Sequence, residues 1–136
     1  AYAAIANTGI KQPVTLKKIE TKSLDGIRIL SEETSKDIMA MLEKVAIRGA
    51  PLAKINGYRI GGKTGTAQIA AANYSSDRHN AIFVGVVPLS QPKLSIAVIV
   101  NEPRGKEYYG GRVAAPVFSE IGSHSLRLLG IAPDDK

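Results

Sequence analysis

The sequence predicts an α+β fold, in which helices cover an antiparallel sheet. Three segments with strand composition, at 58–69, 81–88 and 94–101, follow one another along the chain. The link between the last two is short, and strands joined by tight links pair antiparallel. One segment with apolar residues at helical spacing precedes this group and another follows it. This order differs from the strand–helix alternation that builds a parallel sheet.

The chain begins with the expected end of a helix. Residues 1–9 are typical of two helical turns, which Asn7 and Gly9 close because both residue types tolerate the left-handed conformation. A helix of this length does not nucleate by itself in water. We therefore expect the chain to be a portion of a longer protein, cut inside a helix.

Two short strands and a helix are expected next. β-Branched residues favour a strand at 14–19, and the turn-forming residues 23–26 separate it from a second strand at 27–30. Ser31 then has the side chain of an N-cap, and the helix that follows it ends at Gly49.

Both long helices are expected to bury one apolar face. In the first helix this face comprises Ile38, Met41, Leu42 and Val45. In the second helix, expected from about Arg112 to Leu129 with Pro116 in its first turn or so, it comprises Val113, Val117, Ile121 and Leu128. Gly130 ends this helix, and 131–136 is expected to be a polar tail. The strands at 81–87 and 94–100 are apolar almost throughout, so we expect both faces of the sheet to be covered.

Composition narrows the function classes. The net charge is +6, but the 18 Lys and Arg are scattered without an aromatic stripe. This pattern favours a solvated basic surface over nucleic-acid binding. The chain has no cysteine, which excludes disulfides and thiolate metal sites. His79 and His124 lack the spacing of metal ligands, so we expect neither a metal nor a cofactor. No apolar run approaches the roughly 20 residues of a membrane span.

The residues best suited to chemistry are Lys63-Thr-Gly-Thr66, in the first of the three long strand segments. Lys63 supplies positive charge, and the hydroxyls of Thr64 and Thr66 donate hydrogen bonds, which are strong when the acceptor is ionised. Gly65 lacks a Cβ atom, so a ligand can lie close to the backbone there. On a strand edge, the N–H of Thr66 can point at a developing oxyanion. These residue types suit a site that holds a carboxylate and a carbonyl oxygen.

A second interpretation of the same stretch is a nucleotide-binding P-loop. Residues 57–64 match the pattern Gly-x-x-x-x-Gly-Lys-Thr letter for letter. A P-loop needs an apolar strand before its first glycine and a helix that begins at its lysine. Here turn-forming residues that include Pro51 precede the match, and Tyr58 and Ile60 inside it favour a strand. Gly65 after the lysine is a poor start for a helix. The context therefore favours an extended strand.

Four segments, in their order along the chain, resemble the C-terminal part of the transpeptidase domain of class B penicillin-binding proteins, most closely the division-specific type. They are Ala1-x-x-x-Ile-Ala-Asn-x-Gly9, Gly57-Tyr-Arg-Ile60 with Lys63-Thr-Gly-Thr-Ala-Gln68, Phe83-Val-Gly-Val-Val-Pro88, and Tyr108-Tyr-Gly-Gly-x-Val-Ala-Ala-Pro-Val-Phe118. Lys-Thr-Gly is one of the three motifs of this class and of class A β-lactamases. The resemblance implies a partial penicillin-binding, β-lactamase-like transpeptidase fold. Residues 1–136 would be the C-terminal portion of the domain, with its upstream half missing.

The resemblance also implies an activity. In this family a serine attacks the carbonyl of the D-Ala-D-Ala end of a peptidoglycan stem peptide and expels the last D-Ala. An amine from a neighbouring stem peptide then resolves the acyl-enzyme, and β-lactams acylate the same serine. The implied ligands are therefore stem peptides and β-lactams, with no cofactor. The implied location is the periplasmic face of the bacterial inner membrane, with the anchor outside this segment.

The family's site residues map onto matching positions of this chain. The resemblance implies that Lys63 is the catalytic lysine, which shapes the field and hydrogen bonds of the site. Thr64 and Thr66 would bind the carboxylate of substrate or drug, and the backbone N–H of Thr66 would form half of the oxyanion hole. The other positions that border the pocket are Gly65, Gln68, Tyr108 and Tyr109. For the two tyrosines, simple packing on the sheet is the alternative.

The chain departs from the family pattern at the nucleophile. The family's Ser-x-x-Lys and Ser-x-Asn motifs precede Lys-Thr-Gly, whereas the one Ser-x-x-Lys here is Ser90-Gln-Pro-Lys93, in the link between the last two strands. A serine in a turn lacks the adjacent base that activates a nucleophile, so we interpret Ser90 as a turn residue. The chain alone should therefore neither turn over substrate nor bind penicillin covalently.

Two further expectations concern partners. The chain could instead be a non-catalytic module that binds peptidoglycan or a division protein, and division proteins are candidate partners under either interpretation. The missing upstream half would leave apolar surface uncovered, so we expect the segment to pair with that half or to self-associate.

Overall fold

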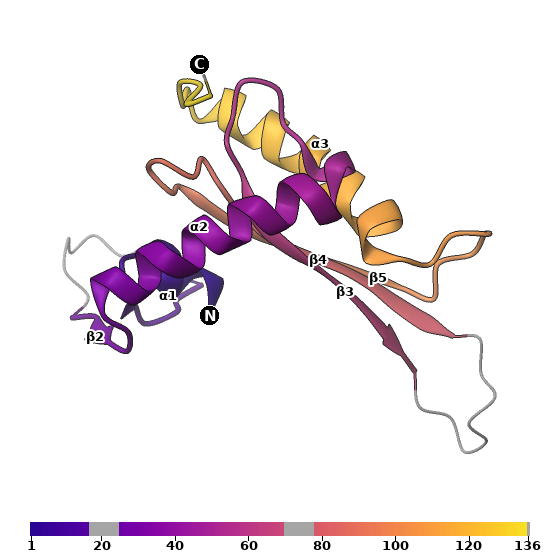
Figure 1. Ribbon diagram of the computed structural model, residues 1–136, viewed down its shortest axis with the longest axis horizontal. Helices are drawn as coiled ribbons and strands as arrows, with labels where there is room; N and C mark the ends of the chain where they lie inside the picture. The colour runs from indigo at the N-terminus through magenta and orange to yellow at the C-terminus, as the bar shows by residue number, and fades with distance from the viewer. Residues whose placement is uncertain (17–24, 70–77, 136) are drawn as a thin grey trace.

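The computed structural model of the protein describes residues 1–16, 25–69 and 78–135. The elements in chain order are α1 (Tyr2–Ala6), β1 (Ile10–Lys11), β2 (Ile27–Arg28), α2 (Glu32–Gly49), the 3₁₀ helix η1 (Pro51–Ala53), β3 (Gly61–Gln68), β4 (His79–Val87), β5 (Leu94–Asn101) and α3 (Gly110–Leu128). The predicted α+β class is confirmed, because helices pack against an antiparallel sheet (Figure 1).

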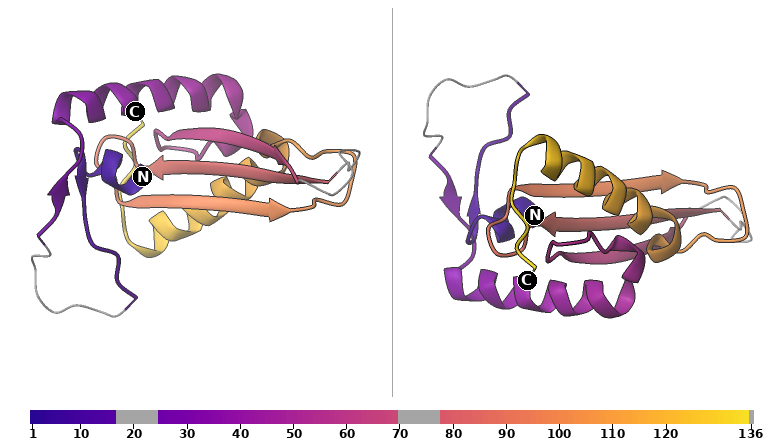
Figure 2. Two further views of the ribbon diagram at one scale, coloured as in Figure 1. Left: turned by 90° about the horizontal axis from the view of Figure 1, so that it is seen from below. Right: turned by 90° about the horizontal axis from the view of Figure 1, so that it is seen from above.

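The main sheet contains three antiparallel strands in the order β3-β4-β5. Gly65 lies opposite Ile82, which in turn lies opposite Ile99. Figure 2 shows α3 crossing one face of this sheet and α2 running alongside β3. Within the described residues no strand pairs with the outer edge of β3, which we call the open edge. The open edge is therefore available to a ligand or to another segment.

Helix α3 buries a different face from the one predicted. Ile121 is 46% exposed and Leu128 is 84% exposed, whereas the buried residues face the sheet. These buried residues are Gly110, Ala114, Ala115, Phe118, Gly122 and Leu126. These residues face the sheet because their small side chains let the axis of α3 lie close to the strands. Phe118 fills the space that remains. The predicted stripe is therefore wrong for Val117, Ile121 and Leu128, whereas Val113 is partly buried. The helix also begins two residues earlier than predicted, at Gly110, which places Pro116 in its interior.

Helix α2 starts as predicted and packs differently. The backbone N–H of Thr34 donates to Ser31 Oγ at 3.0 Å, which confirms the N-cap. Met41 is 56% exposed, and the residues that α2 buries completely are the small Ser35 and Ala46. β3 begins with a glycine at the point where α2 contacts it, so the helix can lie close to the strand. Little space is left between them for large side chains. The expected apolar face is wrong for Met41 and Val45, which point away from the core.

The beginning of the chain differs from prediction in its strands. Residues 14–16 are not a strand; the strand is β1, which pairs with β2. β2 is also shorter than predicted, because it ends at Arg28. The predicted segments 17–19 and 23–24, like the connection 70–77, lie outside the described residues. Gly9 has the left-handed conformation expected of it, with φ of +85°, but Asn7 does not, with φ of −94°.

The first strand of the sheet also starts later than predicted. Residue 58 lies in a tight turn, where the Tyr58 N–H donates to the Ile55 carbonyl at 3.1 Å. Gly57 has φ of +80° in this turn, a conformation that suits glycine. β3 therefore begins at Gly61 and not at 58.

The core lies between α3 and one face of the sheet. The Phe83 ring on β4 and the Phe118 ring on α3 are both fully buried, with centroids 4.8 Å apart. On the opposite face Ile82 and Val84 are only partly buried, and Ile99 is 65% exposed. We call this second surface the open face. The prediction that both faces are covered is wrong for this chain, because no described element lies over the middle of the open face.

The C-terminal residues are anchored, where the sequence predicted only a polar tail. The Asp134 carboxylate accepts hydrogen bonds from the backbone N–H of Arg59 at 2.8 Å and from that of Ser90 at 3.0 Å. The Asp134 N–H itself donates to the Gly57 carbonyl at 3.1 Å. One carboxylate thus joins the turn before β3 to the turn between β4 and β5.

This anchor predicts a pH-dependent contribution to stability. Burial alone would raise the pKa of Asp134, but hydrogen bonds from Ser90 and Arg59 and the positive charge of Arg59 outweigh burial and lower it. A lowered folded-state pKa stabilises the protein above the unfolded value of about 3.9, and the benefit is lost as pH falls through the folded value. Asp134→Asn should therefore lower the Tm by roughly 3 °C at pH 7, and the difference should shrink as the solution is acidified.

Thermal unfolding between pH 7 and pH 2 measures this difference. Asp135→Asn, which removes the neighbouring exposed carboxylate, is the matched control and should change the Tm at pH 7 much less. A constant gap between wild type and Asp134→Asn across the whole pH range would contradict the assignment.

Candidate active site

The predicted site residues meet at the open edge of β3. Successive side chains of a strand point to opposite faces, so Thr64 and Thr66 share the α3 face with Phe83, and Lys63 lies on the open face. The Lys63 side chain nevertheless reaches Thr64, because its Nζ donates to the Thr64 carbonyl at 2.9 Å and lies 3.3 Å from Thr64 Oγ1. The positive charge and the hydroxyl therefore come together at the strand.

Thr66 contacts the beginning of α3. The backbone N–H of Gly110 donates to Thr66 Oγ1 at 3.2 Å. A Cβ atom on Gly110 would lie 2.1 Å from the Ile82 carbonyl oxygen and 2.4 Å from that of Gly65. In this arrangement glycine lets the first turn of α3 lie directly on β3 and β4. The N-terminus of α3 is thereby held beside the second threonine of the motif.

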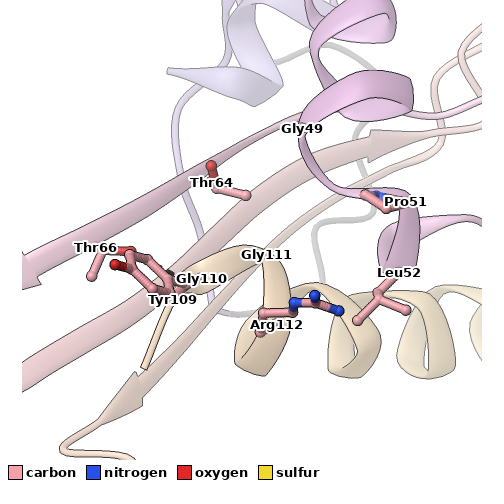
Figure 3. Close-up of a pocket in the computed structure, with 9 residues that line it drawn as sticks. All are labelled: Gly49, Pro51, Leu52, Thr64, Thr66, Tyr109, Gly110, Gly111 and Arg112. Atoms are coloured by element: carbon pink, nitrogen blue, oxygen red, sulfur yellow. Dashed lines mark hydrogen bonds between the residues drawn. The ribbon is translucent and has the colours of Figure 1, made fainter. Parts of the chain in front are cut away.

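A cavity of about 430 Å³ opens beside these threonines (Figure 3). It is lined by Gly49, Pro51, Leu52, Thr64, Thr66, Tyr109, Gly110, Gly111 and Arg112. These residues come from the end of α2, from η1, from β3 and from the beginning of α3. Of the residues predicted from sequence, Thr64, Thr66 and Tyr109 line this cavity directly.

The other predicted residues lie around the cavity. Lys63 and Gly65 flank Thr64 on β3, and Gln68 lies at the far end of this strand, opposite His79. Tyr108 is not a lining residue of this cavity, because it stacks between His79 and Tyr109 with ring centroids 4.3 and 4.4 Å apart. The sequence suggested two roles for the tyrosines, bordering the pocket or packing on the sheet. Tyr109 borders the cavity, and Tyr108 packs behind it.

Sequence reasoning missed several lining residues. Arg112 adds a positive charge to the wall, and Gly49 with Leu52 forms the side opposite β3 (Figure 3). Arg112 was assigned only as the start of a helix, because that start was placed two residues too late. The adjacent Gly110 and Gly111, directly after the two tyrosines, were the signal for a close approach to the strand.

The structure excludes a P-loop at residues 57–64 and places Ser90 in a turn. Lys63 is the third residue of β3, and no helix begins there, so the P-loop interpretation is wrong. Ser90 lies in the turn between β4 and β5, as predicted, and lines a separate cavity with Lys36 and Leu89. The described residues contain no cluster of three His, Cys, Asp or Glu side chains that could hold a metal ion.

Comparison with known proteins identifies the family. The family described as "Penicillin binding protein transpeptidase domain" matches residues 1–123. The chain belongs to the penicillin-binding protein transpeptidase family. The structure agrees, because the transpeptidase domain of Burkholderia pseudomallei penicillin-binding protein 3 superimposes with a TM-score of 0.86 at 38% identity. The match covers 98% of this chain and 41% of that one, so the fold is a part of the penicillin-binding transpeptidase fold.

Relatives of the chain include peptidoglycan D,D-transpeptidases. The peptidoglycan D,D-transpeptidase FtsI of Escherichia coli (strain K12) is 38% identical over 136 residues, which are 98% of this chain and 23% of FtsI. Stage V sporulation protein D of Bacillus subtilis (strain 168) is 41% identical over 124 residues, or 89% of this chain and 19% of that protein. The chain thus spans about a quarter or less of the length of these relatives. In the part of the chain that the structure describes, every helix is too short or too polar to cross a membrane.

Proposed function

We propose that this chain supplies one wall of the active site of a peptidoglycan D,D-transpeptidase. The observation that carries the proposal is the orientation of the two threonine hydroxyls. Thr64 Oγ1 faces the Lys63 ammonium, and Thr66 Oγ1 accepts from the Gly110 N–H. Each oxygen already has a donor, so each hydroxyl proton is left to donate to a ligand. Two donors beside an ammonium group suit the carboxylate at the end of a stem peptide or on a β-lactam.

The backbone of the same strand supports an oxyanion hole. Backbone groups of a strand alternate between its two edges, so Thr66 presents its N–H to the same edge as Thr64. The Thr64 carbonyl accepts from the Lys63 side chain, which supports assigning both residues to the open edge. The Thr66 N–H would then donate to the carbonyl oxygen of the peptide bond under attack. Gly65 between them keeps the edge accessible, since it has no side chain.

The remaining residues would shape the pocket. Tyr109 and Arg112 border the cavity beside the threonines, Gln68 lies farther along β3, and Tyr108 packs behind Tyr109. Lys63 would stabilise negative charge on the substrate and on the tetrahedral intermediate. We assign none of these groups the role of nucleophile, so in the proposal this wall binds and polarises the substrate without attacking it.

The nucleophile would come from the upstream half of the domain. Ser90 sits in a turn, where its backbone N–H and its hydroxyl both donate to the Asp134 carboxylate. The pKa of this carboxyl is lowered, which makes it a weak base for activating a nucleophile. In our proposal an upstream serine attacks the carbonyl at the Thr66 N–H and expels D-Ala, which takes up a proton. The amine of a second stem peptide then displaces the serine, forms the cross-link and loses its proton.

The open face of the sheet supports the upstream half as the partner of this chain. Ile99, Ala97 and Ser95 on β5 are exposed there, although β5 is composed largely of apolar residues. Covering these side chains with the rest of the domain would bury apolar surface that is unfavourable in water. Without that half, the same surface would favour self-association. A location at the periplasmic face of the inner membrane, an anchor outside this segment and contacts with division proteins belong to the same proposal.

A fluorescent penicillin tests the proposal on a denaturing gel. The complete transpeptidase that contains this chain should become covalently labelled, and boiling in detergent should not remove the label. The chain alone, at 14.4 kDa, should remain unlabelled. A label on the isolated chain would mean that it carries its own nucleophile. An unlabelled complete protein would refute the transpeptidase and leave a non-catalytic peptidoglycan-binding module as the better account.

A further inference from the structure

Helix α2 helps to form the wall that lies opposite β3 in the cavity of Figure 3. Gly49, at the end of α2, lines this cavity together with Pro51 and Leu52 of η1. The residues that α2 buries completely are the small Ser35 and Ala46. Apolar contacts are not directional, so they let a helix lie close to a sheet without fixing where it lies along a strand. Directional contacts are needed to fix the position of this wall.

One ion pair joins α2 to the segment that leads into β3. The Glu43 carboxylate accepts two hydrogen bonds from the Arg59 guanidinium, at 2.7 Å from Nε to Oε1 and at 2.8 Å from Nη2 to Oε2. Two parallel hydrogen bonds of this kind fix direction as well as distance. Within residues 1–16, 25–69 and 78–135, no other ion pair joins α2 to a different element.

The backbone of Arg59 is held on both sides. Its N–H donates to the Asp134 carboxylate at 2.8 Å, and its carbonyl accepts from the Leu89 N–H at 2.9 Å. Asp134 belongs to the anchored C-terminal residues, and Leu89 lies in the turn between β4 and β5. The guanidinium therefore extends from a fixed point beside the sheet, and the ion pair sets the position of Glu43 relative to that point.

The ion pair and the cavity wall lie at two matching levels of α2 and β3. A Cβ atom on Gly61, the first residue of β3, would lie 3.5 Å from the backbone nitrogen of Glu43. Gly49 lies six residues farther along the helix, or about 9 Å, and Thr64 lies three residues farther along the strand, or about 10 Å. A Cβ atom on Gly111 would lie 3.2 Å from the Gly49 carbonyl oxygen and 3.3 Å from Thr64 Cγ2. The end of α2 and the Lys-Thr-Gly stretch thus meet at one point of α3.

We propose that Glu43 and Arg59 are positioning residues of the transpeptidase site, an inference that rests on the proposed function. Their ion pair fixes α2 along β3, and the helix carries this position to Gly49 at the cavity. Without the pair, α2 shifts along the strand, and the wall at residues 49–52 encloses the ligand less closely. Neither Glu43 nor Arg59 lines the cavity, so both act through the helix and not on the ligand.

The rate of labelling by fluorescent penicillin, measured against its concentration in the complete transpeptidase, tests this role. Glu43→Gln removes the negative charge, and Arg59→Lys keeps the positive charge but loses the paired hydrogen bonds. Each variant should raise the half-saturating penicillin concentration roughly tenfold, because misplacement by about 1 Å in a site has effects of this order or larger. The maximal rate constant should stay within about threefold, because the wall does not contact the reacting carbonyl at Thr66.

Stability separates positioning from folding. The Arg59 and Glu43 side chains are 43% and 21% exposed, and an ion pair this close to solvent contributes little to stability. The Tm of both variants should therefore stay within about 3 °C of wild type. Glu32→Gln is the matched control, because it breaks the ion pair between Glu32 and Lys36, which lies within α2. This control should keep the wild-type half-saturating concentration.

The double variant tests whether the two residues act as one pair. Glu43→Gln combined with Arg59→Lys should be no more impaired than the more affected single variant, because either change already breaks the pair. If the two effects multiply instead, the residues act separately and the proposal is wrong.

The remaining outcomes distinguish the positioning role from the function on which it rests. If both single variants keep the wild-type half-saturating concentration, the ion pair does not position the wall, and the transpeptidase stands. A smaller labelled fraction at an unchanged half-saturating concentration would assign the pair to folding alone and overturn the proposal. If wild type is not acylated at all, the proposed function fails and the positioning role fails with it.

Discussion

Lys63→Met in the complete transpeptidase should slow acylation by penicillin by at least about 100-fold, the scale on which loss of one transition-state donor acts. The Lys63 ammonium lies 2.9 Å from the Thr64 carbonyl and faces the Thr64 hydroxyl. Methionine keeps much of the length of the side chain but removes its charge and its donors. Both the field on the bound carboxylate and the orientation of the Thr64 hydroxyl would be lost. The second-order rate of labelling by fluorescent penicillin measures the effect.

A matched control separates charge in the site from charge on the surface. Lys44→Met removes an exposed ammonium group from α2. The Lys44 side chain lines none of the cavities described above, so this variant should be acylated at the wild-type rate. Lys63 is itself exposed, so its loss should leave the Tm nearly unchanged. If Lys63→Met is acylated within about threefold of wild type, the role assigned to this lysine is wrong, because a catalytic charge should be worth far more.

Gly85→Ala is expected to destabilise the protein strongly. A Cβ atom at this position on β4 would lie 2.7 and 2.8 Å from two carbons of the Phe118 ring and 3.0 Å from the Gly61 carbonyl oxygen. Phe118 is fully buried and packed against Phe83, so it has no space into which to move. Overpacking of this kind should cost about 3 kcal/mol. Urea unfolding monitored by circular dichroism measures the loss.

The comparison for this substitution is Gly49→Ala. Gly49 is the last residue of α2, and no other atom lies within 4 Å of the position where its Cβ would be. Alanine is favoured over glycine in a helix, so this variant should be within about 1 kcal/mol of wild type. Equal stability of the two alanine variants would show that α3 can move away from β4, contrary to the packing described here.

The sequence by itself determined the local features of this protein. The three strands follow from composition and turn residues, and Ser31 caps α2 because its hydroxyl needs only the N–H three residues later. Gly9 and Gly130 take left-handed conformations for equally local reasons. The Lys-Thr-Gly-Thr stretch was recognisable as a candidate binding site because charge, hydroxyls and a bare backbone are adjacent in the chain.

Only the tertiary structure decided which surfaces are buried and how the site is completed. Most of the predicted apolar stripe of α3 is exposed, because Ala114 and Ala115 permit a closer contact with the sheet on another side of the helix. No periodicity of apolar residues reports that distance. Thr66 meets Gly110, which is 44 residues away in the chain, and Asp134 anchors the turn that precedes β3. A cavity at the beginning of β4 likewise brings together Arg78 and Arg104 from different segments. Contacts of this kind depend on packing between distant segments, which local propensity does not encode.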